Sequence, residues 1–185
     1  NSMDHQALVD YFTEVADSIK VPLIIYNVPK FTGINIEPKT VSQLSTHSNI
    51  IGLKNSNEDI AHTAEIINNT SDDFVTLIGT ASVLFAGLSL GCKGGILALA
   101  NIAADECISI YKNCIDGNYE QSKNTQLKMM EVNKAVTARF GVAGLKAALD
   151  MLGYFGGEPM KPLRKLNEVQ LKELKLILVN AGLLN

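Results

Sequence analysis

The chain has 185 residues, of which 46% are hydrophobic, and its 16 basic and 19 acidic residues give a net charge of −3. This composition excludes a disordered polyelectrolyte, and the scattered, nearly balanced charges exclude a dedicated nucleic-acid or membrane surface. The apolar runs at residues 21–26 and 95–100 are far too short to cross a bilayer, and no signal-peptide pattern opens the chain, so we expect a cytoplasmic protein.

Short continuous apolar runs alternate with stretches of helical apolar spacing through the first part of the chain. The runs are typical of buried strands, and we expect four, at residues 21–26, 49–53, 73–78 and 95–99. Helices are expected at residues 7–16, from Glu37 onward, at 57–67 and at 82–90. Because each parallel crossover needs its own helix, this alternation predicts a parallel α/β sheet.

The second part of the chain keeps a helical period. Helices are expected at residues 108–115, 119–136, 143–152 and 168–179, with a Gly- and Pro-rich loop at 156–162. Four strand and helix units fit either a small doubly wound sheet or half of an eight-stranded barrel. No G-x-G-x-x-G motif follows the first strand and no phosphate-binding P-loop occurs, which argues against nucleotide binding.

The cysteines and histidines give no sign of a disulfide framework or a metal site. The cysteines lack CxxC spacing, and we expect them to be buried small hydrophobic residues. The histidines lie far apart on expected helices or helix ends, and we expect all three at the surface. No serine-hydrolase elbow, zinc-binding helix or calcium loop is present. These residues are Cys92, Cys107, Cys114, His5, His47 and His62.

Parallel α/β proteins carry their reacting groups at the carboxyl ends of strands, where this chain places Tyr26, Lys54 and Gly79. A lysine that follows a buried strand either extends into solvent or, taken out of water, becomes a neutral amine that can attack a ketone. Its position alone does not decide between the two. Because sequential parallel strands lie side by side, the phenol of Tyr26 is expected beside Lys54 as a proton shuttle, although a plain core tyrosine is the alternative.

Several segments resemble the dihydrodipicolinate synthase and N-acetylneuraminate lyase superfamily. These segments are Tyr26-Asn27-Val28-Pro29, Thr32-Gly33, Ile51-Gly52-Leu53-Lys54-Asn55-Ser56, Ala100-Asn101, 139–146 and 153–157. The last two are similar to the C-terminal helices of the 4-hydroxy-2-oxoglutarate aldolase branch. The resemblance implies that Lys54 forms a Schiff base, that Tyr26 relays protons, and that no metal or organic cofactor is needed. It also implies that Gly79, Thr80 and Ile96 line a bound 2-oxo acid.

Two departures from the family pattern bear on specificity. Dihydrodipicolinate synthases normally carry an arginine that holds a substrate carboxylate at the position of Phe31, and a phenyl ring cannot make that bidentate contact. Sialic-acid lyases tend to have acidic residues after the glycine of the next strand, where this chain has Thr80 and Ala81. We therefore expect a pyruvate-dependent aldolase for 4-hydroxy-2-oxoglutarate or a related 2-keto-3-deoxy acid, with dihydrodipicolinate synthase as the alternative.

The resemblance starts after the family's fourth barrel strand. It implies the C-terminal half of a (β/α)8 barrel at residues 1–116 and a helical extension at 117–185, without the paired threonines and second tyrosine of the relay. The opening Asn1-Ser2-Met3 suggests a cloning scar or part of a longer protein. We expect a homo-oligomer, possibly completed by a complementary N-terminal half, and an inactive isolated chain. A non-catalytic assembly module and an unrelated doubly wound ligand-binding domain remain as rival interpretations.

Overall fold

The computed structural model describes residues 4–185, so the opening Asn1-Ser2-Met3 lies outside the described residues. The chain divides into two compact units, one ending at Ile96 and the other spanning Leu97–Asn185. Within the described part, no helix is long and apolar enough to span a bilayer.

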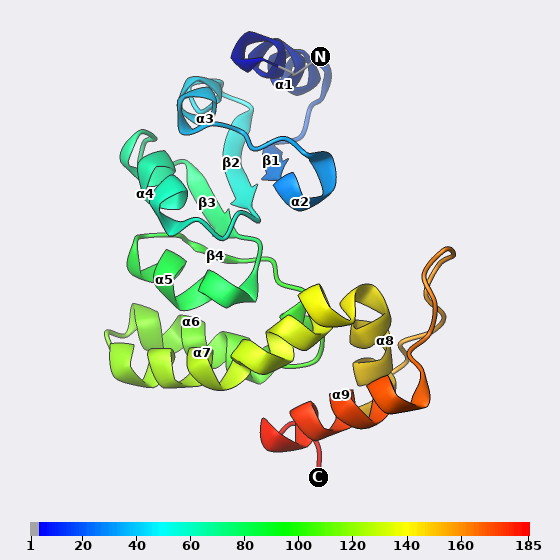
Figure 1. Ribbon diagram of the computed structural model, residues 1–185. Helices are drawn as coiled ribbons and strands as arrows, with labels where there is room; N and C mark the ends of the chain where they lie inside the picture. Colours follow the sequence, from blue (N-terminus) through cyan, green and yellow to red (C-terminus); the bar gives the residue numbers. More distant parts are fainter. Residues whose placement is uncertain (1–3) are drawn as a thin grey trace. The chain divides into compact units, whose positions relative to one another are not determined.

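The first unit contains the four strands found among residues 4–185, together with α1 before them and the helices between them (Figure 1). Its elements in chain order are α1 (His5–Ser18), β1 (Leu23–Asn27), α2 (Pro29–Thr32), α3 (Pro38–Leu44), β2 (Ile50–Asn55), α4 (Ile60–Asn68), β3 (Val75–Ile78), a 3-10 turn (Ala81–Val83), α5 (Leu84–Ser89) and β4 (Gly94–Gly95).

Local sequence explains where these helices begin. The side chains of Asp4 and Asp59 accept hydrogen bonds from the first free backbone N–H groups of α1 and α4. Pro38 starts α3, where its missing N–H costs nothing. His5 Nδ1 lies 2.7 Å from Thr40 Oγ1, a contact that ties α1 to α3.

The sheet is parallel throughout and has the order β1-β2-β3-β4, which confirms the predicted α/β class. Side chains alternate between its two faces. One face carries Ile25 and Leu53, which belong to a buried cluster with residues of α1, α3 and α4. The other face carries Ile24 and Tyr26, whose exposed fractions are 40% and 46%. The sheet is therefore covered by helices on one side and open on the other within this unit.

Two elements differ from expectation. The sequence predicts a fourth strand over residues 95–99, but β4 spans only Gly94–Gly95, and Leu99–Asn101 forms a 3-10 turn. The neighbouring strand β3 ends at Ile78, whose carbonyl accepts a hydrogen bond from the Ile96 N–H. Beyond Ile96 the chain therefore has no strand residues of β3 to pair with, and β4 stays short. The sequence indicates only a turn after the first strand, whereas the structure has the short helix α2 there. This helix begins at a proline and is terminated by Gly33, which takes the left-handed φ of 70°.

The second unit is helical, as expected. Its helices are α6 (Ala104–Ile115), α7 (Tyr119–Lys134), α8 (Gly141–Met151) and α9 (Glu168–Asn180), with a π-helical segment (Ala135–Arg139) between α7 and α8. The Ser122 hydroxyl donates to the Ile110 carbonyl at 2.7 Å and joins α7 to α6 inside the core. Arg139 forms an ion pair with Glu173 of α9. The expected division into half a barrel at residues 1–116 and a helical extension at 117–185 stays a prediction.

Candidate active site

Lys54 and Tyr26 lie side by side at the carboxyl end of the sheet. The two residues are direct partners in the register of β1 and β2. Lys54 Nζ lies 3.9 Å from the centroid of the Tyr26 ring, close enough for a cation–π contact. The sequence prediction of a phenol beside the amine describes this arrangement, while the chemical roles of both groups stay predictions.

Both groups are on the open face of the sheet. Tyr26 is 46% exposed and Lys54 is half-buried. On the same face Leu77 pairs with Lys54 across β3 and is also half-buried. The amine therefore stands between a phenol and an apolar side chain, and it is neither extended freely into solvent nor enclosed in the core.

Gly79 follows β3 at the same edge and allows a close approach of two chains. Its N–H donates to the Asn55 carbonyl at 2.7 Å. A Cβ at this position would overlap Ser56, whose hydroxyl is buried and has no hydrogen-bond partner among residues 4–185. The backbone of β3 can approach β2 this closely only because residue 79 has no side chain.

Thr80 is the first residue of a short chain of hydroxyl groups. Ser82 Oγ donates to Glu58 Oε1 at 2.6 Å, so its own oxygen is free to accept, and Thr80 Oγ1 lies 2.6 Å from it. The proton between the two hydroxyls therefore belongs to Thr80. This leaves the Thr80 oxygen as an acceptor for any further group that reaches it.

Phe31 and Ile96, the remaining predicted site residues, are both exposed. Phe31 is in α2 with 77% of its surface exposed, and Lys30 Nζ lies 5.9 Å from its ring centroid. Ile96 is 52% exposed and follows β4. All six predicted site residues fall in the first unit. Among them, Lys54 and Tyr26 are the pair whose side chains lie within contact distance.

Sequence reasoning missed three polar residues directly behind this pair. Asn27 and Asn55 are 1% and 0% exposed, and their side chains hydrogen-bond to each other at 2.9 Å. His62 is expected at the surface from the sequence, but it is 8% exposed and its ring contacts Asn55. The expectation for His62 is wrong because its helix turns that side chain toward the buried face of the sheet. The available signal was an asparagine shortly after each of the first two runs, Asn27 and Asn55, whereas nothing in the local pattern marks His62.

The cysteines behave as predicted. All three are buried and none is joined in a disulfide, and burial raises the pKa of the Cys92 and Cys107 thiols to about 11 in each case. For Cys107 the neighbouring carboxylate of Glu106 adds to this effect. These thiols are protonated near neutral pH and are poor nucleophiles.

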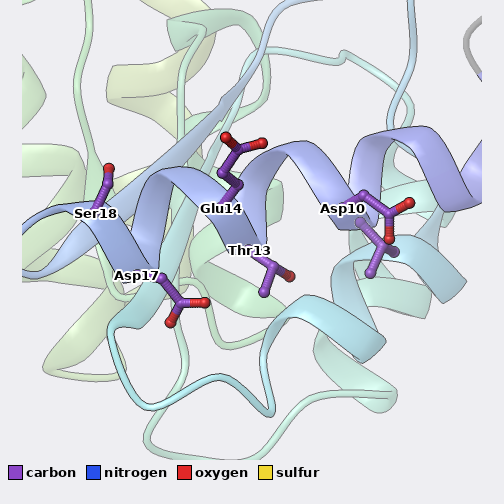
Figure 2. Close-up of a pocket in the computed structure, with 6 residues that line it drawn as sticks. Asp10, Thr13, Glu14, Asp17 and Ser18 are labelled. Atoms are coloured by element: carbon purple, nitrogen blue, oxygen red, sulfur yellow. The ribbon is translucent and has the colours of Figure 1, made fainter.

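A shallow surface pocket on α1 is unrelated to the strand-end residues. Figure 2 shows Asp10, Glu14 and Asp17 projecting from this helix in different directions. His47 Nε2 lies 3.0 Å from Asp17, and Gln6 Nε2 donates to Asp10 at 2.7 Å, so two of these carboxylates already have partners. Among the described residues, no group of three or more His, Cys, Asp or Glu side chains is placed to hold a metal ion.

Comparisons with known proteins agree on one family. The profile of the dihydrodipicolinate synthetase family matches residues 1–181. A curated 4-hydroxy-tetrahydrodipicolinate synthase from Acetivibrio thermocellus is 35% identical over 184 residues, which is 100% of this chain and 62% of that protein. A second one, from Archaeoglobus fulgidus, is 31% identical and covered to 64%. The chain thus spans less than two thirds of the length of these relatives.

Solved structures show the same partial overlap. The crystal structure of a dihydrodipicolinate synthase from Thermotoga maritima superposes with a TM-score of 0.93 and 26% identity, covering 98% of this chain and 63% of that one. A prophage protein of the dihydrodipicolinic acid synthase family from E. coli, solved in complex with pyruvate, gives a TM-score of 0.90 and 26% identity, with coverage of 99% and 63%.

Proposed function

The chain belongs to the dihydrodipicolinate synthetase family, and on that basis we propose that it is the lysine-bearing part of a class I, pyruvate-dependent carbon–carbon lyase. The observation that supports this most is the pairing of Lys54 Nζ and the Tyr26 ring, 3.9 Å apart at the carboxyl ends of adjacent parallel strands. That edge is where α/β enzymes hold their reacting groups.

We further propose that the sheet is the second half of an eight-stranded barrel followed by a helical extension. The open face with Ile24, Tyr26 and Lys54 would then line the barrel interior, while the face packed on α1, α3 and α4 points outward. High structural similarity over about 63% of the length of family members supports this assignment.

In the proposed mechanism the neutral amine of Lys54 attacks the ketone carbon of pyruvate and forms a carbinolamine. Loss of water gives an iminium, which withdraws electrons from the adjacent methyl carbon. Removal of a proton there gives an enamine, which adds to an aldehyde, and hydrolysis of the new iminium releases the 2-oxo acid product. Cleavage runs through the same steps in reverse. Tyr26 moves the proton to or from the aldehyde oxygen.

The proposed substrates are 4-hydroxy-2-oxoglutarate or a related 2-keto-3-deoxy acid. Phe31 carries no charge to hold the carboxylate of aspartate semialdehyde, and its ring is exposed beside the strand ends. The residues proposed to line the 2-oxo acid are Gly79, Thr80 and Ile96, through backbone groups and short side chains. The names of the curated relatives favour a second candidate, dihydrodipicolinate synthase activity, in which pyruvate condenses with aspartate semialdehyde.

Trapping the iminium tests the first proposal. The complete protein that contains this chain is incubated with pyruvate and borohydride, which reduces the iminium to a stable secondary amine. Peptide mapping is expected to find the adduct on Lys54, and a Lys54→Ala variant is expected to show none. An adduct on another lysine, or aldol activity without any adduct, would exclude Lys54 as the nucleophile.

Side-by-side kcat/KM values separate the two substrate candidates. We expect cleavage of 4-hydroxy-2-oxoglutarate to be much faster than condensation of pyruvate with aspartate semialdehyde. A clear preference for aspartate semialdehyde would select the synthase. A cytoplasmic homo-oligomer, with a complementary N-terminal half if one exists as a separate chain, stays part of the proposal. A non-catalytic assembly module would show neither trapping nor turnover.

A further inference from the structure

Asn27 and Asn55 directly follow Tyr26 and Lys54 in their strands, so their side chains point to the opposite, helix-covered face. The two amides are 1% and 0% exposed. Asn27 Nδ2 donates to Asn55 Oδ1 at 2.9 Å across the gap between β1 and β2. A direct side-chain bond therefore joins the two strands immediately behind the residues that carry the proposed chemistry.

Backbone donors fix the orientation of both amides. The N–H of Ile36 donates to Asn27 Oδ1 at 3.1 Å, and the N–H of Asn57 donates to Asn55 Oδ1 at 3.2 Å. A backbone N–H can only donate, so each Oδ1 must face it and each Nδ2 must point the other way. The bond from Asn27 to Asn55 thus has a defined direction.

His62 closes the set of bonds into a ring. Asn55 Nδ2 lies 3.4 Å from His62 Nδ1, and His62 Nε2 lies 3.0 Å from the Ile36 carbonyl. Because Asn55 supplies the hydrogen, Nδ1 is the acceptor and Nε2 carries the proton. The Ile36 N–H returns to Asn27, so the ring runs through Asn27, Asn55, His62 and Ile36. Thr63 Oγ1 accepts a further bond from Asn55 Nδ2 at 3.1 Å.

The same asparagines also hold the strand ends through their backbones. The Asn27 carbonyl accepts from the Ser56 N–H at 2.9 Å, and the Asn55 carbonyl accepts from the Gly79 N–H at 2.7 Å. Side-chain and backbone bonds together fix the ends of β1, β2 and β3 relative to one another. Little freedom remains at the edge of the sheet where Tyr26 and Lys54 project.

We propose that Asn27 and Asn55 are positioning residues that hold the Tyr26 phenol in register with Lys54; this inference rests on the proposed Schiff-base function. Neither amide reaches the open face, so both act through the strands and not on the substrate. Packing alone does not require them, because the neighbouring buried positions of the same face carry Ile25 and Leu53. Asparagine is disfavoured in strands, and burying it requires that all its hydrogen bonds be made.

The test measures kcat, KM for pyruvate and the rate of borohydride-trappable iminium formation in the complete protein, all per folded molecule. Asn27→Leu and Asn55→Leu each remove the bond while keeping side-chain size. We expect kcat to fall roughly 10- to 100-fold in each variant, as for a shift of about 1 Å between reacting groups. We expect KM to change little and the double variant to be no worse than the single ones, because the two amides act as a unit. Thr76→Val on β3 is the matched control. It changes another buried polar side chain of this face, one whose hydroxyl has no hydrogen-bond partner among the residues that the structure describes, and kcat should not change.

Repeating the substitutions in a Tyr26→Phe variant distinguishes positioning of the phenol from a general structural role of the amides. If the amides act by placing the phenol, Asn27→Leu causes little further loss of kcat once the phenol is gone. A loss that is the same with and without the phenol would overturn the inference, as would an unchanged kcat in both single variants.

Should the leucine variants not fold, Asn35→Ala replaces them. Asn35 is exposed and accepts a hydrogen bond from Asn27 Nδ2 at 2.9 Å. It should give a smaller fall of kcat that also disappears in Tyr26→Phe, and a fall that persists there overturns the inference. Absence of any Lys54 adduct in the unmodified protein refutes the proposed function, and with it the premise of the inference.

Discussion

The close packing around Gly79 lets us predict how much the substitution Gly79→Ala lowers the stability of the protein. A Cβ added at this residue would overlap Ser56 Oγ, and it would still lie 2.9 Å from Ser56 Cβ and 3.0 Å from Ser56 Cα. The hydroxyl could rotate away, since it has no hydrogen-bond partner in the described part of the chain. The Cα cannot move without the backbone, and that backbone is held by the bond from the Ser56 N–H to the Asn27 carbonyl.

Overpacking of a core typically costs about 1–3 kcal/mol, and a clash that reaches backbone belongs in the upper part of that range. We therefore expect Gly79→Ala to lower the free energy of unfolding by about 2–3 kcal/mol. For a protein of this size, roughly 2–4 °C of Tm is lost per kcal/mol, so the melting temperature should fall by about 5–10 °C.

Thermal and urea unfolding of the complete protein check this prediction against two partner variants. Ser56→Ala removes only the unpartnered hydroxyl and should be nearly neutral. Ser56→Gly combined with Gly79→Ala removes the overlap with the Ser56 side chain and should recover part of the loss, although the new methyl group still presses on the backbone of residue 56. The reasoning is refuted if Gly79→Ala changes stability by less than about 0.5 kcal/mol, within the scatter of surface substitutions, or if the double variant is no more stable than Gly79→Ala alone.

Further predictions concern the buried thiols of Cys92 and Cys107 and the side chain of Phe31. Because burial raises the pKa of Cys92 and Cys107 from 9.0 to about 11, the folded state holds these protons more tightly than the unfolded chain does. Their contribution to stability is full below about pH 9 and is lost as the pH rises toward 11, which pH-dependent urea midpoints measure; a midpoint that rises over this interval would contradict it. At about pH 8, thiol reagents should label these cysteines quickly only after denaturant is added. Phe31→Arg should raise kcat/KM for aspartate semialdehyde at least about tenfold, in line with one charge-assisted bond; an unchanged value would mean that residue 31 does not contact this substrate.

The strands were predictable because they form continuous apolar runs, in which the residues of one face are buried against helices. The pairing of Tyr26 with Lys54 followed from two facts available in the sequence: each residue ends a run, and sequential parallel strands lie side by side. The length of β4 was not predictable in the same way. It depends on where β3 stops pairing, and Leu97, Ala98 and Leu99 are apolar without being in a strand.

The hydrogen-bonded ring of Asn27, Asn55, His62 and Ile36 could not be predicted from the periodicity of the sequence. Asn27 is bonded to Ile36 and Asn55, 9 and 28 positions away along the chain, and no local spacing connects them. His62 is expected at the surface because histidines on helices usually lie there. Its burial follows from the contact with Asn55, which exists only once α4 packs beside β2. A buried polar network is specified by three-dimensional partners, so a single sequence indicates its members but not its bonds.

The open face of the sheet leads to a prediction about the 185-residue chain taken by itself. On that face Ile24 and Tyr26 are 40% and 46% exposed, and β1 has no partner on its outer side within the described residues. Exposed strand edges and apolar side chains favour pairing with other chains, so the isolated chain should form dimers or aggregates.

Catalysis by the isolated chain should fail for a second reason. Lys54 is only half-buried between Tyr26 and Leu77 in the sheet, and it lacks the further relay groups that the family resemblance implies. Sedimentation, combined with an aldol assay before and after adding the missing family segment as a separate polypeptide, measures both effects. We expect no turnover at first and a gain of activity together with a defined assembly after addition. A stable monomer that turns over substrate unaided would show that the described residues already contain a complete site, and the barrel assignment would have to be abandoned.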